Sequence, residues 1–113
     1  MKIIAVDFDG TLCESKYPSI GEPNRKLIKY LIRERQAGAY IILWTNRTGP
    51  QIAEAVNWCS KYNLHFDAVN ENNPEIIARF GDSRKIYATE YIDDRSTGTK
   101  QFNLPFKMPE SKV

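Results

Sequence analysis

The sequence predicts an α/β protein in which a Rossmann-like parallel sheet is flanked by helices, giving three layers. Apolar, strand-like segments alternate along the chain with amphipathic, helix-like segments, an order typical of parallel strands joined by right-handed crossover helices. The strand-like segments lack polar alternation, which indicates strands that are buried on both faces. The chain has 113 residues, so we expect one domain.

The first strand is expected at residues 2–8. This short run is rich in β-branched apolar side chains and ends in Asp7, Asp9 and Gly10, as in a buried strand that delivers carboxylates at its carboxyl end. The next residues, up to position 23, include two prolines and a glycine. They are predicted to form a loop.

A helix and a second strand follow. Residues 24–37 place apolar side chains at helical spacing and are followed by Gly38, a residue favoured just beyond a helix end. Residues 39–44 form another apolar strand. This strand runs into a polar cluster of Thr45, Asn46, Arg47 and Thr48.

The second half of the chain repeats the pattern. Helices are expected at 50–62 and 74–80, and strands at 66–69 and 85–92. The last strand runs into Asp93 and Asp94. From residue 98 the sequence is polar and interrupted by prolines, so we expect a single domain at 1–97 and an extended or disordered tail at 98–113.

Charge and composition bear on the partners and the compartment. The 16 basic and 14 acidic residues give a net charge of +2 without a charged block, so the global charge does not indicate a nucleic acid or a membrane. The apolar run at residues 3–6 is too short for a signal peptide or a membrane span, and we expect neither. Cys13 and Cys59 show no spacing motif and are interpreted as free thiols in a reducing cytoplasm. We therefore expect a cytoplasmic protein without a membrane partner.

Acidic side chains are expected to meet at one edge of the sheet, because ligands of such sheets bind at the carboxyl ends of the strands. The four carboxylates of Asp7, Asp9, Asp93 and Asp94 would repel one another unless a cation lay between them. Oxygen ligands favour Mg²⁺ over zinc, and the single histidine, His65, lies away from the cluster and is interpreted as structural. The sequence therefore predicts a magnesium site.

Magnesium bound by few protein ligands usually completes its shell with water and a substrate phosphate. Groups that can bind a phosphate are also present: the backbone at Gly10 and the side chains of Thr45, Asn46 and Arg47 follow two of these strands, and Lys85 opens the last one. A carboxylate can attack phosphorus as a nucleophile, and a second carboxylate two residues on can protonate the leaving oxygen and then activate water. Asp7 and Asp9 have this spacing.

The segment Asp7-Phe8-Asp9-Gly10-Thr11-Leu12 resembles the first motif, DxDGT, of the haloacid dehalogenase superfamily of phosphohydrolases. Thr45 after the next long strand, Lys85, and the segment Ile92-Asp93-Asp94-Arg95 match the later motifs in the order of the family. The resemblance covers roughly residues 2–96. It implies that the domain at 1–97 is catalytic.

The resemblance implies a role for each matching residue. Asp7 would be the nucleophile and Asp9 the general acid and base, with Thr45 and Lys85 as phosphate ligands. Mg²⁺ would bind the Asp7 carboxylate, the Asp9 backbone carbonyl and Asp93, with Asp94 acting through a water molecule. The implied activity is a magnesium-dependent phosphatase that forms an aspartyl-phosphate on Asp7.

Lys85 departs from the pattern of the family. It precedes Asp93 by only eight positions, and eight residues of straight strand span roughly 26 Å, too far for both groups to reach one phosphate. Either the chain around Lys85 folds back, or Arg84, Arg47 or another cation binds the phosphate.

Neither interval between the motifs has room for an inserted lid domain. The chain therefore resembles the capless branch of the superfamily, whose members tend to act on macromolecular phosphoesters or to borrow a neighbouring subunit as a lid. The small bacterial and phage hydrolases containing LWT-x-R and YIDDR are the nearest likeness within it. The implied partners are a phosphorylated substrate and, for a borrowed lid, a second copy of the chain.

Each motif also has a plainer interpretation. Asp7 and Asp9 could form an ordinary exit turn from a strand, and Thr45 and Asn46 could cap the helix at 50–62, with or without binding phosphate. Arg47 would more often be a solvated surface charge. Trp44 and Trp58 are interpreted as packing residues rather than as a stacking platform.

A different function class remains open beside the enzyme. A non-catalytic phosphoacceptor or phosphate-binding module, such as a receiver domain, also combines acidic residues, a threonine, a lysine and Mg²⁺ on a parallel sheet. That type has adjacent acids after its first strand, and a lone phosphoacceptor aspartate after its third. Here Asp7 and Asp9 are separated, and the third strand ends in Val69-Asn70.

Overall fold

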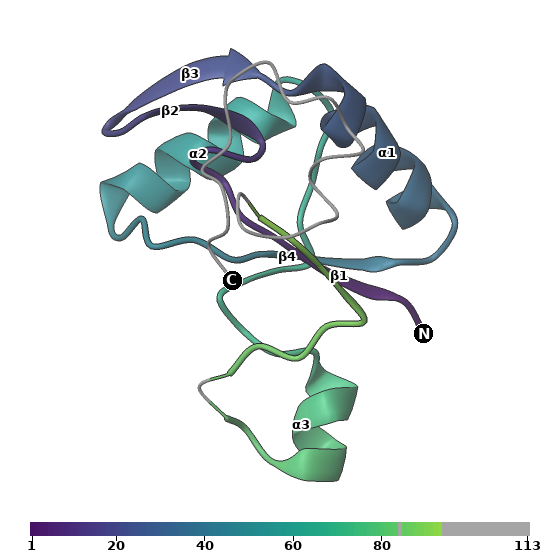
Figure 1. Cartoon of the computed structure of the whole chain (residues 1–113). Coiled ribbons are helices and arrows are strands. Elements are labelled where there is room, and N and C mark those ends of the chain that lie inside the picture. Colours follow the sequence, from purple (N-terminus) through teal and green to yellow (C-terminus); the bar gives the residue numbers. More distant parts are fainter. Residues whose placement is uncertain (84, 94–113) are drawn as a thin grey trace, which may run out of the picture.

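The computed structural model of the chain describes residues 1–83 and 85–93. The strands are β1 (Ile3–Val6), β2 (Cys13–Lys16), β3 (Ser19–Pro23), β4 (Tyr40–Leu43), β5 (Ala68–Val69) and β6 (Glu90–Ile92). The helices are α1 (Arg25–Gln36), α2 (Pro50–Ser60) and α3 (Pro74–Phe80). All three predicted helices are present, and the four predicted strands are present in shorter form (Figure 1).

Four strands form one parallel sheet in the order β5-β4-β1-β6, and β2 and β3 form a separate antiparallel hairpin. In the sheet Val6 of β1 lies between Leu43 of β4 and Ile92 of β6. The prediction of an α/β fold with a parallel sheet is confirmed. The arrangement is compatible with a Rossmann-like fold.

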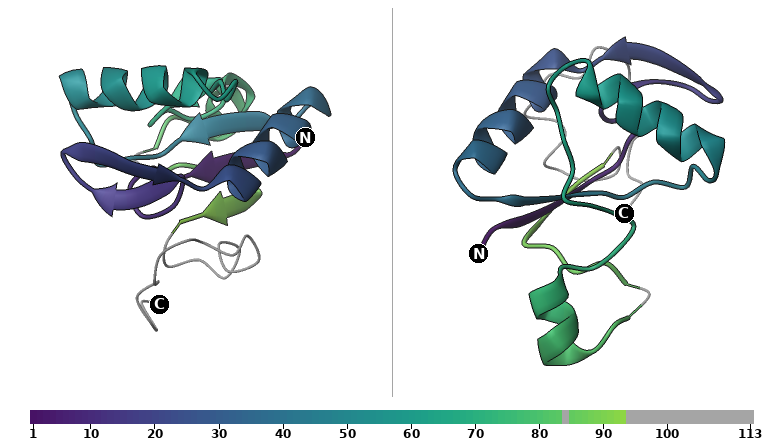
Figure 2. Two further views of the ribbon diagram at one scale, coloured as in Figure 1. Left: turned by 90° about the horizontal axis from the view of Figure 1, so that it is seen from above. Right: turned by 180° about the vertical axis from the view of Figure 1, so that it is seen from behind.

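Helices cover both faces of the sheet, as predicted. The chain moves from β1 to β4 to β5 in one direction, and it then returns to β6 on the other side of β1. Because such crossovers are right-handed, α1 and α2 lie on one face and α3 lies on the other (Figure 2). The strand order therefore reverses between β1 and β6, which is where ligands bind in open sheets of this kind.

The larger core lies between the sheet and the layer that holds α1, α2 and the hairpin. Side chains of a strand alternate between the two faces, so Ile4 and Val6 join this core, whereas Ile3 and Ala5 belong to a smaller cluster on the face of α3. Phe8, just beyond β1, is fully buried in the larger core.

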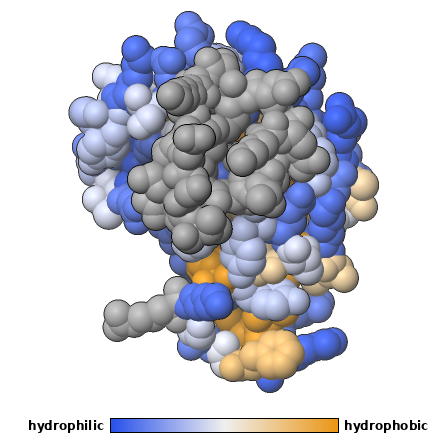
Figure 3. Space-filling view, in the orientation of Figure 1, coloured by the Kyte–Doolittle hydropathy of each residue, from blue (hydrophilic) through white to orange (hydrophobic). Residues whose placement is uncertain are grey.

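The layer on the face of α3 is thin. No residue of α3 is buried, and Phe80 and Tyr87 expose large apolar surfaces. Apolar surface gathers around α3 in the space-filling view (Figure 3). A cavity of about 400 Å³ lies beside it, with Ile76, Tyr87 and Tyr91 among its lining residues.

The helix starts show which polar residues act as caps. The Asn24 side chain accepts from the backbone of Leu27 at the start of α1, and Asn73 accepts from Glu75 at the start of α3. Helix α2 begins after Gly49 and has no side-chain cap. The prediction that Thr45 and Asn46 cap this helix is therefore wrong.

Two segments differ from their predicted conformation. The loop expected after the first motif is the β2–β3 hairpin, where a Cβ on Gly21 would lie 2.5 Å from the Glu14 carbonyl oxygen. Only glycine allows this approach of the two hairpin strands. The strand expected at 85–92 begins at Glu90 instead, since residues 85–89 run as irregular chain along the face of α3 and bury Ile86 and Ala88 there.

Some predictions fall on residues that the structure does not describe. These are Arg84, Asp94 and the tail at 98–113. Within the part of the chain that is described, every helix is too short or too polar to cross a bilayer.

Candidate active site

Three side chains lie in a row at the carboxyl edge of the sheet: Trp44 after β4, Asp7 after β1 and Asp93 after β6. The strand ladder continues into this row, because the backbone N–H of Trp44 donates to the Val6 carbonyl at 2.8 Å and that of Asp7 donates to the Ile92 carbonyl at 2.9 Å. Neighbouring strands lie about 5 Å apart. The two carboxylates therefore start from adjacent backbone positions, at the reversal in strand order.

All three side chains belong to the face of α3. Strand alternation places Asp7 on the same face as Ala5. The Trp44 ring lies 5.7 Å from the ring of Tyr91, which packs in the cluster on that face. Trp44 is nevertheless 39% exposed, so it packs against Tyr91 on one side and forms an open aromatic surface beside Asp7.

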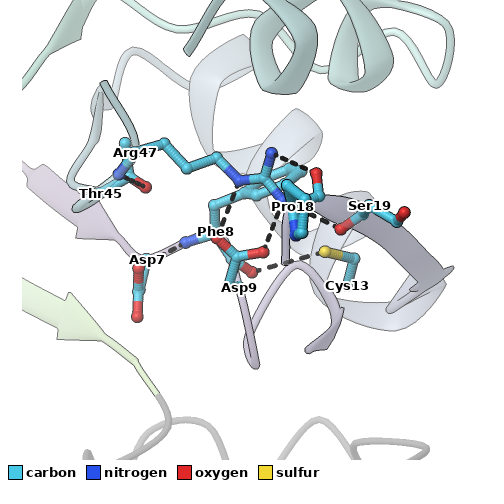
Figure 4. Close-up of polar contacts among 8 residues, drawn as sticks. All are labelled: Asp7, Phe8, Asp9, Cys13, Pro18, Ser19, Thr45 and Arg47. Carbon is cyan, nitrogen blue, oxygen red and sulfur yellow. Dashed lines mark hydrogen bonds and ion pairs between the residues drawn. The ribbon is translucent and has the colours of Figure 1, made fainter. Parts of the chain in front are cut away.

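The Asp7 carboxylate is oriented by the backbone that follows it. Its Oδ1 atom accepts a hydrogen bond of 2.7 Å from the N–H of Phe8 (Figure 4). Phe8 is fixed in turn, because its ring is buried and lies edge-on to Trp58 at 5.6 Å. The first motif thus places an apolar anchor between its two acids.

Asp9 is held by Arg47, which comes from the loop between β4 and α2. The Nε atom of Arg47 donates to Oδ2 of Asp9 at 2.8 Å, and its NH2 atom donates to Oδ1 at 2.8 Å. This is the bidentate geometry that makes arginine–carboxylate pairs strong. In Figure 4 the Asp9 carboxylate points toward Arg47, whereas the Asp7 side chain points away from it.

Arg47 also holds the hairpin. Its NH1 and NH2 atoms donate to the carbonyls of Pro18 and Ser19, each at 3.1 Å. Its guanidinium carbon lies 5.0 Å from the ring centres of both Phe8 and Tyr17. Arg47 is only 2% exposed, so its interpretation as a solvated surface charge is wrong.

These contacts define the charge state of Arg47. Its hydrogen bond with Asp9 raises the pKa of the guanidinium above its ordinary value. A guanidinium has five N–H donors, and Arg47 makes four hydrogen bonds, two to Asp9 and two to the hairpin. As placed, the residue is occupied by Asp9 and the hairpin, and its predicted role as a phosphate ligand stays a prediction.

Thr45 is fixed by a residue that sequence reasoning missed. Asn70 donates to the Thr45 carbonyl at 3.0 Å and accepts from the Thr45 N–H at 2.9 Å. The Thr45 hydroxyl accepts from the N–H of Arg47 at 3.1 Å and keeps its own proton for donation to a ligand. Asn46, by contrast, is exposed. Of this pair of predicted phosphate ligands, only Thr45 is held in place by hydrogen bonds.

Gly10 forms part of a turn. Its φ of 82° is in the left-handed region, which glycine adopts readily, and its N–H donates to the Cys13 carbonyl at 3.0 Å. This amide, predicted to face a phosphate, is therefore already paired within the turn.

Lys85 lies five residues before β6, so its predicted place within that strand is wrong. Its N–H donates to the Ser83 hydroxyl, and its carbonyl accepts from the Asn72 side chain. Asn72 comes two residues after Asn70, at the carboxyl side of β5. The backbone at Lys85 thus lies beside the segment that leaves β5. The side chain is exposed, and its contact with a phosphate stays a prediction.

The donor set at this edge fits magnesium. Among residues 1–83 and 85–93, no group of three or more His, Cys, Asp or Glu side chains is arranged to hold a metal. Mg²⁺ does not need such a cage, because it usually binds one or two carboxylates and keeps water or phosphate as further ligands. Asp7 and Asp93 supply two such carboxylates from adjacent strands. Asp9 has both carboxylate oxygens engaged by Arg47, which leaves its backbone carbonyl as the implied ligand.

The missed residues carry weak signals in the sequence. Asn70 stands directly after an apolar strand, at a position where its φ of 54° favours asparagine. The hairpin partners of Arg47 are backbone carbonyls, and Tyr17 lies in a segment interpreted as a loop. No residue type in the hairpin indicates that it contacts Arg47.

Comparison with known proteins gives one informative match. No protein-family model and no curated protein matches the chain. A solved structure described as a conserved protein from Bacteroides thetaiotaomicron matches with a TM-score of 0.74 and 42% sequence identity, over 86% of this chain and 78% of that one. At this identity and coverage, the chain belongs to the same family as that conserved Bacteroides thetaiotaomicron protein.

Proposed function

We propose that this protein is a magnesium-dependent phosphatase that hydrolyses a phosphomonoester through an aspartyl-phosphate on Asp7. The observation that carries the proposal is the placement of Asp7 and Asp93 on adjacent strands at the reversal in strand order, with Asp9 fixed two residues further on. This placement agrees with the resemblance of the sequence to the haloacid dehalogenase superfamily. On this proposal the described part of the chain is a catalytic core of that type without a cap.

In the first step an Asp7 carboxylate oxygen attacks phosphorus, and the bond between phosphorus and the ester oxygen breaks. The electron pair of that bond goes to the leaving oxygen, which takes a proton from the Asp9 carboxylic acid. Thr45 supports this step because its hydroxyl proton can be donated to a phosphoryl oxygen. The products are an alcohol and the aspartyl-phosphate.

In the second step Asp9, now a carboxylate, takes a proton from water. The resulting hydroxide attacks phosphorus, and the bond from phosphorus to Asp7 breaks. Inorganic phosphate leaves, and both acids return to their starting protonation states.

Magnesium would be held by Asp7 and Asp93, with the Asp9 backbone carbonyl as the further ligand that the resemblance implies. When bound, it neutralises charge on the phosphoryl oxygens and orients the phosphate. Asp94 lies outside the described residues, and its role in this site rests on the resemblance alone.

The test is phosphate release from p-nitrophenyl phosphate by the purified protein, with and without Mg²⁺. We expect turnover that requires Mg²⁺ and that Asp7→Asn abolishes while the far-ultraviolet circular dichroism is unchanged. Asp82→Asn is the matched control, since Asp82 is exposed on the loop after α3. Undiminished turnover by Asp7→Asn would contradict the proposal.

A non-catalytic phosphoacceptor would behave differently in the same assay. It would take up one phosphoryl group, release one equivalent of p-nitrophenol and release no inorganic phosphate, whereas the phosphatase turns over many times. A burst of one equivalent of p-nitrophenol without phosphate release would therefore favour the alternative.

The row formed by Trp44, Asp7 and Asp93 supports a site open to large substrates, because Trp44 is 39% exposed and no residue of α3 is buried against that face. We propose phosphorylated macromolecules as one substrate class, and nucleotides and sugar phosphates as others. A lid supplied by a second copy and a cytoplasmic location are part of the same proposal. A phosphate-release screen over these classes, together with the mass in solution, tests it.

A further inference from the structure

We infer that Arg47 is a positioning residue that aligns Asp9 for protonation of the leaving group and couples it to the β2–β3 hairpin. The inference rests on the proposed function, and it assigns Arg47 a task other than the binding of phosphate. The observation behind it is that the buried guanidinium of Arg47 contacts both carboxylate oxygens of Asp9 and two backbone carbonyls of the hairpin.

The charged side chain of Arg47 is almost completely buried, which is unusual for an arginine. A guanidinium that is 2% exposed loses most of its hydration, and this costs free energy unless nearly every donor is paired. Four hydrogen bonds meet this requirement, and the rings of Phe8 and Tyr17 supply further attraction for the cation. Arg47 is thus built into the fold at one fixed position.

The bidentate pair fixes the plane and the direction of the Asp9 carboxylate. Each carboxylate oxygen has two lone pairs, and Arg47 uses one on each. One of the two remaining lone pairs can carry the proton, and the O–H group so formed donates to the oxygen of the leaving group. A lysine could bind only as a point charge and would not fix the plane.

The same pair acts on the proton transfer itself. When Asp9 gives its proton to the leaving oxygen, it becomes a carboxylate, the form that a bidentate guanidinium binds best. The step begins with protonated Asp9, which binds Arg47 less strongly than the ion pair of the structure, so Arg47 gains interaction energy as the leaving group is protonated. This assistance matters most for a basic leaving group, which cannot depart unprotonated, and little for a weakly basic one.

The hairpin contributes to the position of Asp9, because its carbonyls bind the guanidinium atoms of Arg47. The carbonyls of Pro18 and Ser19 each accept from Arg47 at 3.1 Å. Tyr17, 58% exposed, covers its outer side. A displacement of the hairpin would thus be passed to Asp9 through Arg47.

The test compares Arg47→Lys with the wild-type protein on p-nitrophenyl phosphate, whose leaving group is weakly basic, and on phenyl phosphate, whose leaving group is more basic. We expect kcat/KM for phenyl phosphate to fall at least about tenfold more than that for p-nitrophenyl phosphate. The inhibition constant of inorganic phosphate should stay within about twofold of its wild-type value, since a positioning residue does not touch the phosphate.

Two further variants sharpen the test. Arg35→Lys is the matched control, because Arg35 pairs with Asp67 through one exposed contact of 3.0 Å away from the site, and it should leave both esters unaffected. In an Asp9→Asn background, Arg47→Lys should change the ratio of the two esters by less than about twofold, because both changes remove the same proton transfer. Should the lysine variant fail to fold, as judged by circular dichroism, Arg47→Gln takes its place.

Three results would overturn the inference. An equal loss on both esters would make Arg47 a structural residue. A large rise in the inhibition constant of phosphate would make it a phosphate ligand. A wild-type protein inactive on both esters would overturn the proposed function and this inference with it, whereas the first two results leave the proposed function intact.

Discussion

The Asn70 side chain pairs with both backbone polar groups of Thr45, through hydrogen bonds of 2.9 and 3.0 Å. The amide thereby ties the residue that follows β5 to a residue two positions beyond the end of β4. Thr45 is 8% exposed, and its hydroxyl accepts from the backbone N–H of Arg47 at the start of the loop. The position of the predicted phosphate ligand thus depends on a side chain from a neighbouring strand end.

Asn70→Gly should lower the free energy of unfolding by about 1–3 kcal/mol, because it leaves the Thr45 backbone without those partners while still allowing the positive φ. Denaturant unfolding measures the effect. Asn63→Gly is the matched control: Asn63 has a similar φ of 65° and is exposed, so its replacement should change stability by less than about 0.5 kcal/mol. Equal effects at the two positions would mean that the two hydrogen bonds contribute nothing.

Arg47→Ala should lower the free energy of unfolding by about 3 kcal/mol. The substitution leaves the Asp9 carboxylate and the two hairpin carbonyls without their hydrogen-bond donor. Arg35→Ala removes an ion pair whose arginine side chain is 43% exposed and should cost at most about 1 kcal/mol. Both are measured by urea unfolding at neutral pH. A loss at Arg47 no larger than that at Arg35 would contradict the account of the buried pair.

Trp44 should report ligand binding at the candidate site. It is 39% exposed and lies beside Asp7, whereas Trp58 packs against Phe8 and Tyr62. Addition of Mg²⁺ and vanadate, which resembles phosphate in shape and charge, should change the tryptophan emission of the wild-type protein and of Trp58→Phe. Trp44→Phe should lose the change. If the signal instead disappears in Trp58→Phe and persists in Trp44→Phe, the ligand binds elsewhere.

Stability should fall as the pH rises above about 9. Burial raises the pKa of the Cys13 and Cys59 thiols from 9.0 to about 12. Between these values the unfolded chain loses both thiol protons while the folded chain keeps them, so the equilibrium shifts toward unfolding. Below pH 9 neither state loses the proton, and this contribution is fully present.

Urea midpoints measured on both sides of pH 9 test this expectation. Cys13→Ala with Cys59→Ala should weaken the pH dependence, even though the smaller side chains lower stability overall. An unchanged slope in the double variant would assign the pH dependence to tyrosines or lysines instead.

The fold could be predicted largely from the sequence, because strand burial and helix amphipathicity leave local patterns. The helix at 74–80 was predicted to the residue, since a proline and an apolar stripe define it. The strand at 85–92 was predicted too long, because Ile86 and Ala88 are apolar for a different reason: they cover the sheet from the face of α3. An apolar run indicates burial, and it does not say whether the run lies within the sheet or on it.

Only the part of the candidate site that lies directly at the ends of strands could be predicted from the sequence. Asp7 and Asp93 follow buried strands, and their adjacency follows from topology. The contact of Arg47 with Asp9 joins residues 38 positions apart and depends on a hairpin that the sequence indicates only as a loop. No local pattern distinguishes a buried arginine from a surface one, so its role became visible only in three dimensions.

The central claim is that Asp7 carries a phosphoryl group during turnover. The most direct measurement quenches the protein in acid during hydrolysis of p-nitrophenyl phosphate with Mg²⁺, reduces it with borohydride, which converts an aspartyl-phosphate to homoserine, and locates the change by peptide mass spectrometry. The account predicts homoserine at position 7 in the wild-type protein and none in Asp7→Asn. Active, steadily hydrolysing protein with unmodified Asp7, or with homoserine at another aspartate, would contradict it.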